Sequence, residues 1–134
     1  MTSKELTQIY YINQEINTWQ KELDRIHNQS MIKGQQLTGM PHSPGGSDST
    51  AKIAVEIAEY EKLIRDAQYR AAVARARIMA YINTIDDSFI RQIIFLRDIA
   101  CLPWDIVAAE VGGDNTADGV RMVHKRFLEK MDKK

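Results

Sequence analysis

The sequence predicts an all-α protein. A long antiparallel, coiled-coil-like helical hairpin (residues 1–85) is expected to precede a helix-turn-helix domain (residues 86–134). Two long segments carry apolar residues at alternating steps of three and four, which is the period of one helix face. Glycines and prolines cluster between these segments, and three shorter helical patterns follow them. The length of 134 residues suits one domain with a modest core, or a small domain with an appendage.

The first long segment, residues 3 to about 30, is expected to be one helix. Its apolar face consists of Ile9, Ile12, Ile16, Trp19, Leu23 and Ile26. Glycine and proline then recur through residues 31–50, which predicts a loop. An unstructured loop of this length is uncommon inside a compact domain, so it is expected to link two long helices.

The second long helix is expected to begin near Ser47-Asp48-Ser49-Thr50, whose side chains suit a helix cap. Its apolar face consists of Ile53, Ile57, Tyr60, Ile64, Ala67, Ala71, Ala74, Ile78, Tyr81 and Ile85. Residues 51–85 contain neither glycine nor proline, so the helix is expected to be continuous. The alanines let a bulky partner side chain approach closely. The two segments therefore predict a coiled-coil hairpin or an oligomerisation stalk.

Three shorter helices are expected after residue 85. Asp86-Asp87-Ser88 is a helix start, and Cys101-Leu102-Pro103 is a break with proline placed near the start of the next helix. Gly112-Gly113 predicts a turn, and Asn115 or Thr116 is expected to cap the last helix.

A short helix, a glycine turn and a second helix with a basic outer face match the helix-turn-helix plan. The predicted inward residues are Ile106, Val107, Val111, Val120, Val123 and Phe127. The predicted outward residues are Asp118, Arg121, Met122, Lys125 and Arg126. Arginine and lysine bind phosphates and guanine edges, so the helix at about 116–131 is predicted to enter the major groove of double-stranded DNA.

The predicted DNA-binding set has members with different roles. It comprises Asn115, Thr116, Asp118, Arg121, Met122, Lys125 and Arg126. Arg121 is the leading candidate for a DNA contact, and Lys125 and Arg126 are expected to meet phosphates. Asn115 and Thr116 are first of all helix caps, although a capped helix end can also hold a phosphate. Met122 occupies a position where a base-reading side chain would be useful.

The charge of the chain is polarised although its formal net charge is zero. Residues 119–134 contain six basic and two acidic side chains, which gives +4, so the other 118 residues carry −4. This distribution excludes a protein that coats nucleic acid along its whole length. It is compatible with a focused and modest DNA affinity that dimerisation would strengthen.

The carboxy-terminal third contains a series of short motifs, namely Ile93-Ile94-Phe95-Leu96-Arg97, Leu102-Pro103-Trp104-Asp105-Ile106-Val107-Ala108, Val111-Gly112, Thr116, Val120-Arg121 and Arg126. This series resembles region 4 of bacterial sigma-70-type factors. With the loop Gly39 to Ala51 between two helices, the chain also resembles the RinA/ArpU-like late transcriptional activators of phages. These resemblances imply a phage or prophage regulator of late-gene transcription. For such a regulator, the hairpin is expected to dimerise the protein or to contact host RNA polymerase.

The front of the last helix departs from the sigma pattern, which is usually polar there and often carries arginine and glutamate. This chain has Ala117, Asp118 and Gly119 instead. Glycine costs about 1 kcal/mol in a helix interior relative to alanine. Asp118 would repel a phosphate unless it accepts a hydrogen bond from a cytosine amino group. A promoter specificity like that of a housekeeping sigma factor is therefore not expected.

Catalytic and metal-binding patterns are not found in the sequence. Nucleophile-elbow, phosphate-loop and dinucleotide-binding motifs are missing. Cys101 is the single cysteine, and His27, His42 and His124 are scattered. No enzyme activity, cofactor or metal is expected. A polar amino terminus and the lack of a long apolar run indicate a cytoplasmic protein.

Two alternatives stay open. A small terminase-like DNA-packaging subunit also joins a helix-turn-helix to helical oligomerisation elements, but its DNA-binding part is usually amino-terminal. A structural adaptor would use the hairpin for oligomerisation and the helix-turn-helix for protein contacts only. A closed ring would favour packaging, and a dimer would favour regulation.

Overall fold

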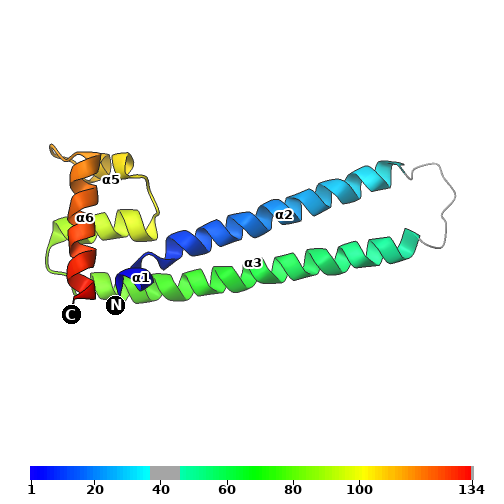
Figure 1. Cartoon of the computed structure of the whole chain (residues 1–134), viewed down its shortest axis with the longest axis horizontal. Helices are drawn as coiled ribbons and strands as arrows, with labels where there is room; N and C mark the ends of the chain where they lie inside the picture. Colours follow the sequence, from blue (N-terminus) through cyan, green and yellow to red (C-terminus); the bar gives the residue numbers. More distant parts are fainter. Residues whose placement is uncertain (37–45, 134) are drawn as a thin grey trace. The chain divides into compact units, whose positions relative to one another are not determined.

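The computed structural model describes residues 1–36 and 46–133, with side chains for 1–30 and 49–133 (Figure 1). This part of the chain is mostly helical and contains no strand, which confirms the all-α class. In chain order the elements are α1 (Ser3–Leu6), α2 (Gln8–Gln36), α3 (Gly46–Ile82), α4 (Ser88–Ile94), the π-helical turn η1 (Phe95–Ile99), α5 (Trp104–Val111) and α6 (Ala117–Asp132). Among the described helices, none is both long and apolar enough to cross a membrane.

The chain divides into two compact units, which we call the terminal unit and the distal unit. The terminal unit comprises Met1–Asn13 with Arg70–Lys134, and the distal unit comprises Gln14–Tyr69. The boundary that the sequence suggested, at residues 85 and 86, falls inside the terminal unit. The difference arises because both the first helical turns and the end of α3 bury apolar side chains against the carboxy-terminal helices.

In the distal unit, α2 and α3 bury the faces that their apolar spacing predicts. Leu23 and Ile26 of α2 and Ile64 and Ala67 of α3 are buried. The rings of Trp19 and Tyr60 lie with their centroids 6.1 Å apart. The remaining predicted positions of this unit are half-buried, namely Ile16, Ile53 and Ile57. Alternating steps of three and four therefore identified the contact faces of both helices.

The predicted loop at 31–50 is helical at both of its ends. Helix α2 continues through residues 31–36 and α3 already begins at Gly46, so the prediction was too long. One glycine in a helix costs only about 1 kcal/mol, which does not suffice to end α2 at Gly34. The expected capping group at residues 47–50 lies within the first turns of α3. Residues 37–45, the rest of the predicted loop, lie outside the described residues.

The first predicted helix is interrupted at Thr7. Thr2 and Glu5 form a capping box at the start of α1, in which each side chain accepts from the other's backbone N–H. The Thr7 hydroxyl donates to the carbonyl of Ser3 at 3.1 Å. Such local bonds offer the backbone an alternative to helix continuation. The short α1 places Leu6 in the core with no exposed surface, a core residue that the apolar pattern did not include.

Two apolar clusters form the core of the terminal unit. The first joins both ends of the chain and consists of Leu6, Ile9, Ala74, Ile78, Ile82, Ile94 and Ile99. Phe127, Leu128 and Met131 of α6 pack against it. The second cluster lies under α5 and α6 and consists of Ile93, Val107, Ala108 and Val120. Helix α6 therefore contacts both clusters, which fixes its inner face.

The segment from α4 to α5 follows the predicted start and break. Asp87 caps α4 by accepting from the backbone N–H of Phe89 at 2.9 Å. The chain then widens into η1, where the N–H of Ala100 donates to the carbonyl of Phe95 at 3.0 Å. It leaves the helix through Cys101, which has a positive φ of 56°. This break turns the chain so that α5 can begin at Trp104.

Candidate nucleic-acid interface

The turn between α5 and α6 depends on two glycines. Gly112 and Gly113 have φ angles of 80° and 67°, a conformation that residues with a Cβ rarely adopt. The side-chain amide of Asn115 donates to the Gly112 carbonyl at 2.8 Å. Asn115 therefore satisfies the end of α5 rather than the start of α6.

Thr116 is the cap of α6, in agreement with the prediction. Its Oγ1 accepts from the backbone N–H of Gly119 at 3.0 Å. A Cβ added to Gly119 would lie 3.0 Å from the same Oγ1, a contact tighter than nine in ten real Cβ contacts. Gly119, which departs from the sigma pattern, is thus explained by close packing under the cap.

The inner face of this helix pair agrees with the prediction except at one residue. Val107 and Val120 are buried, and Val111, Val123 and Phe127 are half-buried. Ile106 was predicted to point inward, but 42% of its surface is exposed. The prediction was wrong because Trp104, Val107, Ala108 and Val111 already form the inner face of this eight-residue helix. One residue before Val107, the helix has turned Ile106 away by about 100°.

The outer face of α6 is polar and largely basic. Asp118, Arg121, Lys125 and Arg126 are exposed, as predicted. Met122 was predicted to point outward but is half-buried, which makes it a poorer base reader than the sequence suggested.

The charges on this face are only weakly paired. Arg121 Nη2 lies 3.6 Å from Asp118 Oδ1, three residues earlier on the same helix. Both side chains are exposed, and exposed pairs of this kind contribute about 0–1 kcal/mol. Lys125 and Arg126 form no ion pair with any described residue. Three cations on one side of the helix are therefore available to an anionic ligand.

A buried polar pair fixes α6 against η1. His124 Nε2 lies 2.8 Å from Asp98 Oδ2, and both side chains are almost fully buried. The sequence prediction did not include this pair. The sequence did contain a sign that His124 is buried, because it lies four residues after Val120 and three before Phe127, at the spacing of the inward face.

Arg97 and Trp104 extend this pair into a small network. The Trp104 ring meets the His124 ring edge-on, with centroids 5.1 Å apart. The Arg97 guanidinium lies 4.4 Å from the centroid of Trp104, and its Nη1 donates to the Leu102 carbonyl at 2.9 Å. Burial raises the pKa of Asp98, and its hydrogen bond with His124 works in the opposite direction. The network joins η1, α5 and α6, so it sets the position of the basic face.

The far end of α6 is held by the start of the chain. The backbone N–H of Ser3 donates to Asp132 Oδ1 at 3.0 Å, and its hydroxyl donates to Oδ2. These two hydrogen bonds lower the pKa of Asp132. Because α6 is anchored at this end as well, its exposed front half is presented on a fixed support.

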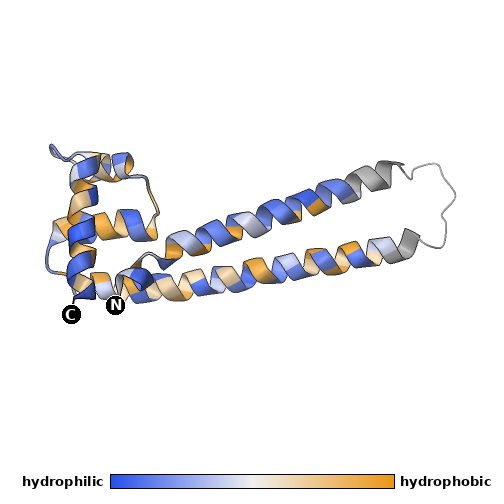
Figure 2. Ribbon diagram, in the orientation of Figure 1, coloured by the Kyte–Doolittle hydropathy of each residue, from blue (hydrophilic) through white to orange (hydrophobic). Residues whose placement is uncertain are grey.

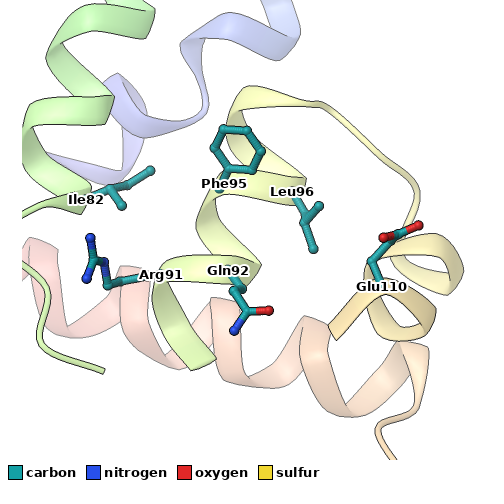
Figure 3. Close-up of a pocket in the computed structure, with 6 residues that line it drawn as sticks. All are labelled: Ile82, Arg91, Gln92, Phe95, Leu96 and Glu110. Carbon is teal, nitrogen blue, oxygen red and sulfur yellow. The ribbon is translucent and has the colours of Figure 1, made fainter. Parts of the chain in front are cut away.

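A small hollow lies elsewhere on the terminal unit (Figure 3). It has a volume of about 290 Å³ and is lined by Ile82, Arg91, Gln92, Phe95, Leu96 and Glu110. Phe95 is exposed, and Glu110 of α5 lines the hollow beside Leu96 of η1. Its apolar walls suit a protein side chain better than a phosphate backbone.

Comparisons with protein families, curated proteins and solved structures gave no match. Among residues 1–30 and 49–133, no group of three or more His, Cys, Asp or Glu side chains is placed to hold a metal ion. The geometry and charge of α6 and its supports are therefore the features of this chain that indicate a function.

Proposed function

We propose that the protein is a DNA-binding phage or prophage transcriptional regulator, a sigma-like late-gene activator. In this proposal α5 and α6 form the helix-turn-helix, and α6 enters the major groove. One observation carries it: Arg121, Lys125 and Arg126 form an exposed basic face on a helix whose opposite face is anchored by Val120 and His124.

The chemistry of this face suits a nucleic acid. Lys125 and Arg126 would neutralise phosphates, whereas the guanidinium of Arg121 can also meet a guanine edge with two hydrogen bonds. Asp118 pairs with Arg121 in the absence of DNA and would repel a nearby phosphate unless it accepts from a cytosine amino group. Asn115 and Thr116 act in the turn and the cap, so their expected contribution to DNA binding is indirect.

The long helices complete the proposal. We propose that α2 and α3 form a coiled-coil-like hairpin that dimerises the protein. A local charge of only +4 favours a modest affinity per copy, which two linked copies would multiply. Host RNA polymerase is the second proposed partner, since the sigma-like resemblance implies action on transcription. The apolar hollow beside Phe95 offers one surface for such a protein contact.

A small terminase-like packaging subunit remains the second candidate. The long helices α2 and α3 favour it, because packaging subunits combine DNA binding with helical oligomerisation elements. The carboxy-terminal position of α6 counts against it. A ring of many copies in solution would select this candidate over the regulator, and a dimer would select the regulator.

The DNA contact is tested with a matched pair of arginines. Arg25 is a control for Arg121: the two side chains are 51% and 53% exposed, and each pairs with an acid three residues earlier. Duplexes enriched by the wild-type protein from a random pool are titrated with wild type, Arg121→Ala and Arg25→Ala. Arg121→Ala should lose about tenfold or more in affinity and relax sequence preference, as expected for a base contact. Arg25→Ala should bind like wild type.

The recognition role of α6 would be overturned if Arg121→Ala bound every duplex as tightly as wild type at low salt. Circular dichroism of the three proteins confirms that each is folded before binding is compared.

A further inference from the structure

Besides the face that packs on α2, helix α3 has a second stripe of regularly spaced residues within the distal unit. We call this stripe, which contains both apolar and charged side chains, the outer seam. It consists of Val55, Glu59, Lys62, Asp66 and Tyr69, again at alternating steps of four and three. Each position lies two residues after a position of the face that packs on α2. Two residues turn a helix by about 200°, so the outer seam faces nearly opposite to α2.

The outer seam is exposed although it contains large apolar side chains. Val55 is 59% exposed and Tyr69 is 71% exposed. Glu59, Lys62 and Asp66 are also exposed and form no ion pair with any described residue. Helix α2 differs, since every exposed side chain between residues 14 and 30 is polar. Figure 2 shows this contrast, with α2 mostly hydrophilic and apolar colour recurring along α3.

The order of the charged residues along the outer seam favours a second copy of this chain in antiparallel orientation. In an antiparallel pair of α3 helices related by a two-fold axis at the level of residue 64, Lys62 stands opposite Asp66 of the other copy. The symmetry makes this contact twice. A parallel pair would instead place Lys62 against Lys62 and Asp66 against Asp66, which is repulsive. Charged residues at seam positions of a coiled coil fix its register and orientation in this manner.

The same register accounts for the exposed apolar residues. Tyr69 falls level with Glu59 of the other copy, with Ala58 of that copy adjacent and Val55 about one turn away. Ala58 is small and exposed, so it leaves room for the tyrosine ring. The stripe is thus complementary to itself in both shape and charge.

We propose that the outer seam is a homodimer interface in which a second copy of this chain packs antiparallel across a two-fold axis. The proposal rests on the dimerisation part of the proposed function and is independent of any DNA contact. It names the face, the register and the orientation of the pair.

A charge exchange tests the register. Sedimentation equilibrium of the full chain, without DNA, gives the dimer dissociation constant. Lys62→Asp and Asp66→Lys should each raise this constant about tenfold or more, since each change makes two repulsive contacts per dimer. The double variant restores both contacts and should return close to wild type. Lys21→Asp, an exposed change on α2, is the control and should leave the constant unchanged.

Disulfide trapping tests the orientation. In a Cys101→Ser background, Glu59→Cys and Tyr69→Cys proteins are oxidised separately and as a mixture. The mixture should give a crosslinked dimer and each protein alone should not, because equivalent residues lie about ten residues apart along the pair, or roughly 15 Å. Crosslinking of either protein alone would contradict the antiparallel arrangement.

A monomeric wild type would overturn the proposal. So would a dimer whose dissociation constant the charge changes leave unaltered and whose cysteine variants do not crosslink. Loss of DNA binding with an intact dimer would leave it standing and count only against the DNA contact.

Discussion

Asp118 and Arg121 share the exposed front of α6, and their ion pair is what a bound phosphate or base must displace. Asp118→Asn removes the competing carboxylate and reduces repulsion of the DNA backbone. We expect it to raise affinity for duplex DNA of mixed sequence about threefold to tenfold, with stability changed by less than about 1 kcal/mol. Anisotropy titration measures the affinity. Glu22→Gln, which releases Arg25 in the same manner, should leave DNA binding unchanged. Weaker binding by Asp118→Asn would instead indicate that the carboxylate itself contacts a base.

The buried pair of Asp98 and His124 gives a second prediction at the scale of single residues. His124→Leu leaves a buried carboxylate without its partner, which should lower the free energy of unfolding by about 3 kcal/mol at neutral pH. Burial already raises the pKa of Asp98, and loss of His124 should raise it further. A raised native-state pKa favours the folded protein as pH falls. The difference in free energy of unfolding between wild type and His124→Leu, measured by urea titration, should therefore shrink as the pH falls toward about 4. A deficit that grows on acidification would contradict this account of the pair.

The sequence was informative about exposed residues of the site and less so about its supports. The outward positions of Arg121, Lys125 and Arg126 follow from helical spacing alone. The Asp98–His124 pair could not be derived in this way, because its members lie on different helices and meet only when η1 packs on α6. Ile106 was misplaced because spacing in a helix of only eight residues leaves the direction of the inner face uncertain by one residue.

At the scale of elements, the start of α6 combines a cap with a crowded glycine. Thr116→Ala should cost about 1 kcal/mol of stability, because the hydroxyl no longer accepts from the Gly119 N–H. Gly119→Ala in wild type should gain little, since its Cβ would meet Thr116 Oγ1 at 3.0 Å. In a Thr116→Ala background that atom is gone, and the same change should gain about 1 kcal/mol of helix propensity. Urea denaturation of the four proteins measures this non-additivity. An equal change in stability on Gly119→Ala in both backgrounds would contradict a close contact between the new Cβ and Thr116 Oγ1.

The helices themselves were largely predictable, and their ends were less so. The apolar spacing gave α2, α3 and α6, and the cap residues Asp87 and Thr116 were recognised by type. The interruption at Thr7 was not recognised, because it depends on a capping box and on the docking of Leu6. The ends of α2 and α3 extend into glycine-containing sequence, where the cost of one glycine is small beside that of breaking a long helix.

At the scale of the whole molecule, the division into two units could not be predicted from the spacing of apolar residues in the sequence. Ser3 bonds to Asp132, and the first and last helices share one cluster of apolar side chains. Such contacts between the chain ends leave no periodic signal. The polarised charge, by contrast, could be read from the sequence. Helix α6 holds the cations of that basic segment on a supported outer face, and this arrangement is the centre of the proposed function.

The salt dependence of DNA binding tests that claim most directly. The affinity of the full chain for one duplex is measured across a series of salt concentrations, with Lys125→Ala, Arg126→Ala and the control Lys21→Ala. If α6 meets phosphates, the logarithm of affinity should fall linearly with the logarithm of salt concentration. Each α6 variant should reduce that slope by about 0.9, and the control should leave it unchanged. No binding at roughly 50 mM salt, or equal slopes for all four proteins, would contradict a DNA-binding role for α6.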